Sequence, residues 1–332
     1  MSAKAWLQLF RAPNLFTVPG DPLAGFLIAT GGILDARVVP AVVASMCLYS
    51  AGLAMNDVID YREDLAERPS RPLPSGAISR TAALTAILGL CVAGIATVHA
   101  GLGPRAAVMG VALLLTIWLY NFTTKRLPIV GPLTMGTCRG LSILLGAVAG
   151  IGPDLRWLNV GLALPDSLSF LVPYFYFQSH SMGSWYFNKA ILAGFASMLY
   201  IAAVTNLARH ETKPVIPKFA KMLPLAAIFA GYLIVKLFTG RILMDPSPTL
   251  WLVAVVLCII QTGDVLKQPA QMLPRSIGGY IRLLLVMQAA LCVMPDNVGG
   301  GFPKTPASLL CAFGLLAMVP LSAWAGRKFY AS

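Results

Sequence analysis

Three aspartates lie close together in a chain that is otherwise poor in charge. Asp57, Asp60 and Asp64 follow a long apolar run, whereas only 11% of all residues are charged. Offsets of three and four place such residues on one face of a helix, where like charges repel. A hard divalent cation removes this repulsion, because Mg²⁺ prefers carboxylate and phosphate oxygens. With Asn56 beside them, the three acids predict a Mg²⁺–diphosphate site.

Cationic side chains in two later segments complement these acids. Residues 68–76 contain three prolines and a glycine, which end any helix and make a stiff, exposed loop. Arg68 and Arg71 on this loop suit bidentate contacts with phosphate oxygens. Tyr120 and Lys125 belong to a further polar segment, and we expect them to contact the same diphosphate; the alternative is that Lys125 and Arg126 serve only to orient the chain in the membrane.

Two charged residues fall within apolar runs, where charge is costly. Arg139 lies about two turns into such a run, and an intramembrane charge indicates a functional role unless another element explains it. We expect Arg139 to bind diphosphate, although a structural contact between helices is the alternative. Asp21 stands between Gly20 and Pro22, so it either faces a cavity or satisfies backbone groups freed by the proline.

This set of residues predicts the chemistry of a lipid diphosphate whose tail runs down between the helices. Mg²⁺ and the cations would stabilise the departing diphosphate and promote ionisation of an allylic C–O bond. An acceptor would then capture the allylic cation, while a dry cavity keeps water away. The plainer alternative is a set of exposed ion pairs that contribute little, for instance Asp64 with Arg68 one helical turn away.

The composition places these residues in a membrane. The chain has 332 residues, of which 57% are hydrophobic, and its mean hydropathy is +0.75. Soluble proteins carry about 25% charged residues, more than twice the share found here. Apolar runs long enough to cross ~30 Å of hydrocarbon recur along the whole sequence. We therefore predict an all-α polytopic transmembrane bundle of nine to ten spans, in a single domain over residues 1–332.

The charge distribution orients this bundle. We expect ten spans, at about 14–34, 38–57, 79–100, 104–121, 131–151, 187–206, 221–240, 248–263, 277–294 and 306–325. With these spans, 16 of the 25 Lys and Arg residues fall on one side of the membrane and 6 on the other. The positive-inside rule then predicts that both termini and the aspartate segment are cytoplasmic.

The net charge of +12 does not indicate a nucleic-acid partner, because the basic residues lie in loops between spans. The lipid bilayer is the expected partner instead. Six cysteines are scattered singly, without metal-ligand spacing or a disulfide framework. No motif in the sequence selects an acceptor, a prenyl chain length or an oligomeric state.

The aspartate segment and the loop after it resemble the UbiA superfamily of intramembrane prenyltransferases. The family motif Asn-Asp-x-x-Asp-x-x-x-Asp is complete at Asn56, Asp57, Asp60 and Asp64. The Arg-Pro-Leu-Pro-Ser-Gly that follows it is complete at residues 71–76. The segment with Tyr120 and Lys125, and the arginine of the fifth expected span, also look like family features.

The resemblance implies a function and a role for each of these residues. Members of the superfamily bind a polyprenyl diphosphate through Mg²⁺ and prenylate a small, often aromatic, acceptor. By resemblance, the three aspartates would be linked to the metal. Arg71, Lys125 and Arg139 would contact the diphosphate.

The sequence departs from the family at the second aspartate motif, which is expected after the sixth span. Residues 205–213 read Thr-Asn-Leu-Ala-Arg-His-Glu-Thr-Lys, so Glu211 is the only acid there. This segment and the extra tenth span resemble the divergent UbiA-like proteins called EboC. In one interpretation Arg209 and Lys213 contact the diphosphate directly and Glu211 keeps a metal or acid–base role. In the other, catalysis is lost and lipid binding remains.

Two functions of different kinds follow from these observations. The first is Mg²⁺-dependent transfer of a prenyl group to a small acceptor. The second is a non-catalytic protein that binds or translocates a prenyl lipid precursor. The position of the acids at one membrane face favours the enzyme, because transport sites usually lie near the midplane on broken helices.

Overall fold

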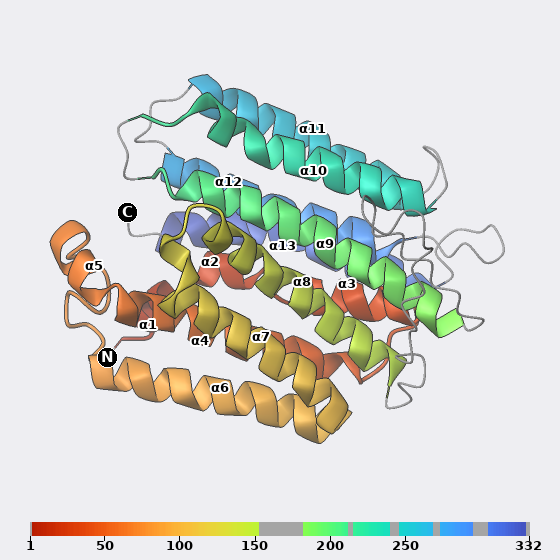
Figure 1. Cartoon of the computed structure of the whole chain (residues 1–332), viewed down its shortest axis with the longest axis horizontal. Coiled ribbons are helices and arrows are strands. Elements are labelled where there is room, and N and C mark those ends of the chain that lie inside the picture. The colour runs from red at the N-terminus through yellow and green to blue at the C-terminus, as the bar shows by residue number, and fades with distance from the viewer. Residues whose placement is uncertain are drawn as a thin grey trace, which may run out of the picture.

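The computed structural model describes residues 2–152, 182–211, 215–239, 246–267, 273–294 and 305–329. Within these ranges the regular structure is entirely helical, and the long helices run side by side as one bundle (Figure 1). The predicted all-α transmembrane bundle is therefore confirmed.

The helices follow one another in this order: α1 (Ala3–Leu9), α2 (Ala12–Leu15), α3 (Gly20–Ala29), α4 (Val38–Ile59), α5 (Tyr61–Glu67), α6 (Arg80–Leu102), α7 (Pro104–Phe122), the 3₁₀ turn η1 (Thr124–Arg126), α8 (Val130–Ile151), α9 (Met182–Ala208), α10 (Lys218–Thr239), α11 (Pro246–Lys267), α12 (Leu273–Cys292) and α13 (Pro306–Phe329).

Eight of the described helices are long and apolar enough to cross a membrane, namely α4, α6, α7, α8, α9, α10, α11 and α13. The other two expected spans are also helical but differ in character. The ninth is α12, a helix of 20 residues whose apolar sequence is interrupted by Arg282 and Gln288. The first is not one helix, because the chain breaks between α2 and α3.

The break in the first span has a local cause. Pro13 lies in the short helix α2, and Pro19 directly precedes α3, in which Pro22 occupies the first turn. Proline is tolerated in the first turn of a helix but not in its interior, so the prolines restart the helix instead of continuing it. As a consequence, the carbonyl of Thr17 lies outside a regular helix and is available to other elements.

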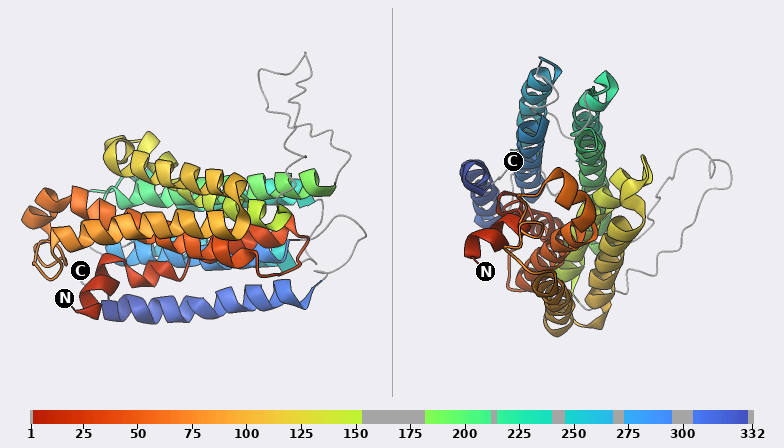
Figure 2. Two further views of the ribbon diagram at one scale, coloured as in Figure 1. Left: turned by 90° about the horizontal axis from the view of Figure 1, so that it is seen from below. Right: turned by 90° about the vertical axis from the view of Figure 1, so that its left-hand side faces the viewer.

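The centre of the bundle is formed by α3, α8, α9 and α12, while α6 and α11 lie at opposite edges (Figure 1). The start of α1, the end of α13 and the short helix α5 gather at one end of the bundle (Figures 1 and 2). This places both ends of the described chain beside the aspartate segment, as the alternation of the expected spans requires.

Glycines allow α3 and α8 to cross with their backbones in contact. A Cβ on Gly25 would overlap the carbonyl oxygen of Ile143, and one on Gly146 would overlap that of Pro22. Backbone atoms cannot move aside as a flexible side chain can, so these two positions accept only glycine. The close crossing brings Asp21 of α3 next to Arg139 of α8.

We expect Gly146→Ala to destabilise the protein by about 2 kcal/mol or more, because overpacking forces two backbones apart. Thermal unfolding of purified protein in detergent measures the effect. Gly89→Ala on α6 is the matched control, since a Cβ there meets no atom within 4 Å. Equal melting temperatures for the two variants would contradict the close α3–α8 crossing.

Candidate active site

Two adjoining cavities open toward the end of the bundle that carries α5. The inner cavity has a volume of about 180 Å³ and lies between α3, α4, α7 and α8. The mouth cavity has a volume of about 310 Å³ and reaches from α1 and the 70–72 loop across to α9, α12 and α13. Six residues line both of them: Arg11, Tyr49, Leu53, Tyr120, Met135 and Arg139.

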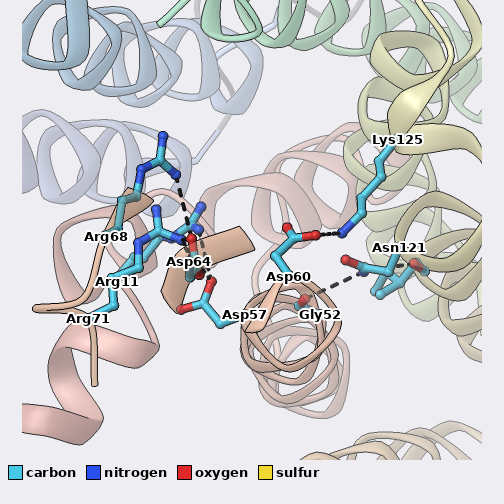
Figure 3. A network of polar contacts seen from close by, with 10 residues as sticks. Arg11, Gly52, Asp57, Asp60, Asp64, Arg68, Arg71, Asn121 and Lys125 are labelled. Carbon is cyan, nitrogen blue, oxygen red and sulfur yellow. Dashed lines mark hydrogen bonds and ion pairs between the residues drawn. The ribbon is translucent and has the colours of Figure 1, made fainter. Parts of the chain in front are cut away.

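Asp57 and Asp64 face one another across a shared arginine (Figure 3). Nη1 of Arg71 lies 2.8 Å from Oδ2 of Asp64 and 3.7 Å from Oδ1 of Asp57. Arg11 adds a contact of 3.2 Å to Asp57, and Arg68 lies 4.0 Å from Asp64. Both carboxylates are buried, so each needs these cations as counter-charges. The structure thus brings together four of the predicted site residues, with Asp57 lining the mouth cavity.

Asp60 points away from the other two acids, toward Lys125 (Figure 3). The expectation that all three share one helix face is wrong for Asp60. Its physical reason is that α4 ends at Ile59 and α5 begins at Tyr61, so Asp60 is the junction, where a ψ of 6° departs from helical geometry and the side chain pairs with Lys125. Among the described residues no three His, Cys, Asp or Glu side chains are grouped so as to hold a metal.

The α7–α8 connection carries Lys125 and is fixed against α4. Lys125 lies in the turn η1 and forms an ion pair with Asp60. Nδ2 of Asn121 donates to the carbonyl of Ile117 at 2.9 Å and approaches that of Gly52 at 3.5 Å. Asn121 and Tyr120 both line the inner cavity, as does the predicted residue Asn56. Oδ1 of Asn121 is buried without a hydrogen-bond partner among the described residues.

Arg139 is held within the bundle by α3. Its Nη1 donates to Oδ2 of Asp21 at 2.6 Å, and its Nη2 donates to Oγ1 of Thr17 at 2.8 Å. The guanidinium also lies over the ring of Tyr49, 4.9 Å from the centroid. Gln288 of α12 donates to Oδ1 of Asp21 at 2.6 Å and to the carbonyl of Thr17 at 2.7 Å. Arg139 also lines both cavities. It therefore combines the structural contact between helices with a position at the site.

The segment in place of the second aspartate motif contributes one acid. Glu211 lines the mouth cavity, as do Asp57 and Arg71. Arg209 instead donates to the backbone carbonyls of Arg126, at 3.0 Å, and Leu127, and it lines neither of the two cavities. Its proposed contact with diphosphate therefore has no support from its position, and Lys213 lies outside the described residues.

The site residues that the sequence did not predict include Arg11, Thr17 and Gln288. Arg11 is one of the 16 basic residues that predict the orientation, and it also donates to Asp57 from the turn between α1 and α2, in a left-handed backbone conformation with φ of 46°. The signal for Gln288 was available, because an amide within an apolar run needs a partner. Thr17 carried no signal, since its carbonyl becomes available only through the break in the first span.

The fold and the site define a multi-pass membrane protein in which an acidic and cationic mouth leads to a largely apolar inner cavity. Residues 22–261 match the UbiA prenyltransferase family, and the chain belongs to that family. The resemblance inferred from the aspartate motif is thereby confirmed.

Curated relatives include digeranylgeranylglyceryl phosphate synthases. The enzyme of Pyrococcus furiosus is 33% identical over 167 residues, which cover 49% of this chain and 56% of the relative. That of Methanoculleus marisnigri is 32% identical over 163 residues, which cover 48% of this chain and 57% of the relative. The matching segment thus spans little more than half the length of these relatives.

Solved structures share the fold at low identity. A UbiA homologue from Aeropyrum pernix superimposes with a TM-score of 0.62 at 18% identity, covering 83% of this chain and 96% of that one. A UbiA homologue from Archaeoglobus fulgidus gives a TM-score of 0.54 at 12% identity, covering 99% of this chain and 100% of that one.

We expect the Asp60–Lys125 pair to show a coupling energy of about 1 kcal/mol in a double-mutant cycle of Asp60→Asn and Lys125→Gln. Only 19% of the Asp60 side chain and 12% of the Lys125 side chain are exposed, so the pair is screened less than a surface pair. Unfolding in mixed detergent micelles measures the cycle. The exposed pair Arg37–Asp35 is the control. A coupling no larger than that of the control would contradict the contact.

Proposed function

We propose that this protein transfers a prenyl group from a polyprenyl diphosphate to an acceptor in the membrane, with Mg²⁺ as cofactor. The observation that carries the proposal is the cation held between two buried carboxylates at the mouth of an apolar cavity. Arg71 lies between Asp57 and Asp64 on a part of the wall where a charged headgroup can enter from the aqueous side.

The donor set fits magnesium. Mg²⁺ is usually bound through one or two carboxylates together with substrate phosphates and water, so a cluster of three acids is not required. Asp57 and Asp64 already share the cationic group of Arg71, which supports the placement of a positive charge between them. Asp57 and Asp64 would hold the ion, and Asp60 and Glu211 are the further acids at this end. When bound, Mg²⁺ offsets the charge that develops on the departing diphosphate.

The inner cavity suits the prenyl tail. Leu53 of α4, Leu113 and Ile117 of α7 and Met135 of α8 line it. Leu53 and Met135 line both cavities, whereas Leu113 and Ile117 line only the inner one, so a tail can leave water while its diphosphate stays near the cations. Burial of the tail contributes roughly 25 cal/mol for each Å² of apolar surface removed from water.

The cations of the site assist the departure of diphosphate. As the allylic C–O bond breaks, its electron pair leaves with the diphosphate oxygen. Arg71 and Arg139 line the mouth cavity, where they are placed to donate hydrogen bonds to the anion, and Tyr120 lies between the two cavities. Lys125 lines neither cavity and is paired with Asp60, so its contact with the anion stays a prediction. A nucleophilic atom of the acceptor then bonds to the allylic carbon and loses its proton. The largely buried site limits the access of water to the cation.

The mouth cavity is the proposed site of the acceptor. Its far wall is apolar and consists of Ile201 and Val204 of α9 with Ile277 and Ile281 of α12. Such a wall suits an acceptor with an apolar part, which is consistent with the phosphate-bearing lipid in the names of the relatives. Glu211 lies on the same cavity and is the proposed proton acceptor, because the second aspartate motif is otherwise missing.

We further propose that the end carrying the acids faces the cytoplasm. The excess of Lys and Arg on that side supports this orientation, and α1, α5 and the end of α13 lie together there (Figure 2). A prenyl diphosphate made in the cytoplasm could then enter the mouth cavity directly.

Mg²⁺ and geranylgeranyl diphosphate together should raise the melting temperature of the purified protein, because a ligand at 100 times its Kd stabilises the folded state by about 2.7 kcal/mol. We expect Asp57→Asn to abolish this gain. Asp35→Asn, at the opposite end of the bundle, should keep it. If neither the metal nor the diphosphate changes the melting temperature of the wild type, the enzymatic proposal fails and the carrier function takes its place.

The orientation is tested by fusing green fluorescent protein to the C-terminus in a bacterial host. We expect bright cells, because this protein becomes fluorescent in the cytoplasm and not after export across the inner membrane in unfolded form. A fusion of alkaline phosphatase at the same position should be inactive. Active phosphatase with dark cells would reverse the proposed orientation.

A further inference from the structure

The guanidinium of Arg139 has one edge occupied and one edge open. A guanidinium has five N–H groups in a fixed plane. Nη1 donates to Asp21 and, at 3.3 Å, to the carbonyl of Thr17, while Nη2 donates one hydrogen to Oγ1 of Thr17. Within the described part of the chain, Nε–H and the second hydrogen of Nη2 have no acceptor. Nε and Nη2 form one edge of the guanidinium, and such an edge can bind an oxyanion through two parallel hydrogen bonds.

Gln288 of α12 contacts the groups that hold Arg139. Its side chain is fully buried and lines neither cavity. Nε2 donates both hydrogens, one to the carbonyl of Thr17 and one to Oδ1 of Asp21, at 2.7 and 2.6 Å. Gly20 makes room for the amide, because a Cβ there would overlap Oε1 of Gln288. The amide therefore contacts the two groups that hold Arg139, without touching Arg139's open edge.

Loss of Gln288 would change what Thr17 and Asp21 can offer to the arginine. The carbonyl of Thr17 would keep only the longer bond from Arg139, and Oδ1 of Asp21 would lose its one donor within the described part of the chain. A buried acceptor without a hydrogen bond costs about 1–3 kcal/mol. The guanidinium can recover part of this cost by turning its open edge toward these oxygens, since its donors are the nearest ones. Such a rotation removes the pair of donors from the cavities.

We propose that Gln288 is a positioning residue, which acts through Asp21 and Thr17 to keep the Nε edge of Arg139 directed at the cavities. The ligand of that edge is a phosphoryl oxyanion of the diphosphate, so this inference rests on the proposed function. Gln288 itself does not touch the substrate. Gln288 lies on α12, the ninth span, whose apolar sequence Arg282 and Gln288 interrupt. The proposal therefore makes this span part of the diphosphate site.

The test uses full-length protein in detergent with Mg²⁺, and measures the Kd of inorganic pyrophosphate and of geranylgeranyl diphosphate by calorimetry. Gln288→Met keeps the size of the side chain and removes the amide. We expect the Kd of both ligands to rise about tenfold, with a melting temperature close to that of the wild type.

In prenyl transfer, KM for the diphosphate should rise more than kcat falls. Gln261→Met on α11 is the control, because Gln261 also donates to a backbone carbonyl but lines neither cavity.

A second comparison shows whether Gln288 acts through the arginine. In an Arg139→Lys background the open edge no longer exists, so Gln288→Met should add little to the loss of affinity. Equal effects of Gln288→Met in the two backgrounds would overturn the proposal. If Gln288→Met does not fold, Thr17→Val is the second variant: it removes the hydroxyl that accepts from Arg139 and that donates to the carbonyl of Asn14. This variant should raise the Kd in the same direction, and an unchanged Kd overturns the proposal as well.

The outcomes separate this inference from the proposed function. Wild-type protein that binds neither pyrophosphate nor geranylgeranyl diphosphate overturns both. Wild-type binding that is lost in Asp57→Asn but unchanged in Gln288→Met supports the diphosphate site and overturns the role of Gln288 alone.

Discussion

A buried carboxylate in a membrane protein needs a cation, and the site depends on this constraint. Removing a charge from water costs several kcal/mol unless an opposite charge is close by. Asp57 and Asp64 meet this requirement through Arg71, and the arginine is available because prolines hold residues 68–76 outside any long helix. The pairing fixes the loop over the end of α4. It also keeps acids and cations together at the mouth, where a metal-bound diphosphate needs both.

The same constraint acts deeper in the bundle, where the break in the first span is the place of a second cluster of charged and polar residues. Between α2 and α3 the carbonyl of Thr17 leaves the helix, and Asp21 follows it at full burial. Arg139 and Gln288 satisfy both, so α3, α8 and α12 are tied together by polar bonds as well as by packing. Glycines at the α3–α8 crossing permit the short distances that these bonds require.

The cluster around Asp57 and the cluster around Asp21 each place an arginine on the wall that the two cavities share. Arg139 reaches this wall from inside the bundle, and Arg11 reaches it from the aqueous end beside Asp57. Between them Tyr49 and Tyr120 separate an apolar inner space from the mouth. A ligand that has a charged head and an apolar tail is complementary to a charged mouth cavity followed by an apolar inner cavity. The membership of the chain in the UbiA prenyltransferase family agrees with this chemistry.

The sequence by itself determined the membrane class, the positions of most helices, the aspartate motif and the family, because hydropathy and residue spacing are local properties. It also placed Asp57, Arg71 and Lys125 at one end of the bundle through the order of the spans. Only the tertiary structure decided which cation pairs with which acid. The junction between α4 and α5 turns Asp60 toward Lys125, and the break before α3 brings Gln288 to Asp21 across 267 residues of sequence. Contacts between distant segments follow from packing angles and helix breaks, which no periodicity in the chain encodes.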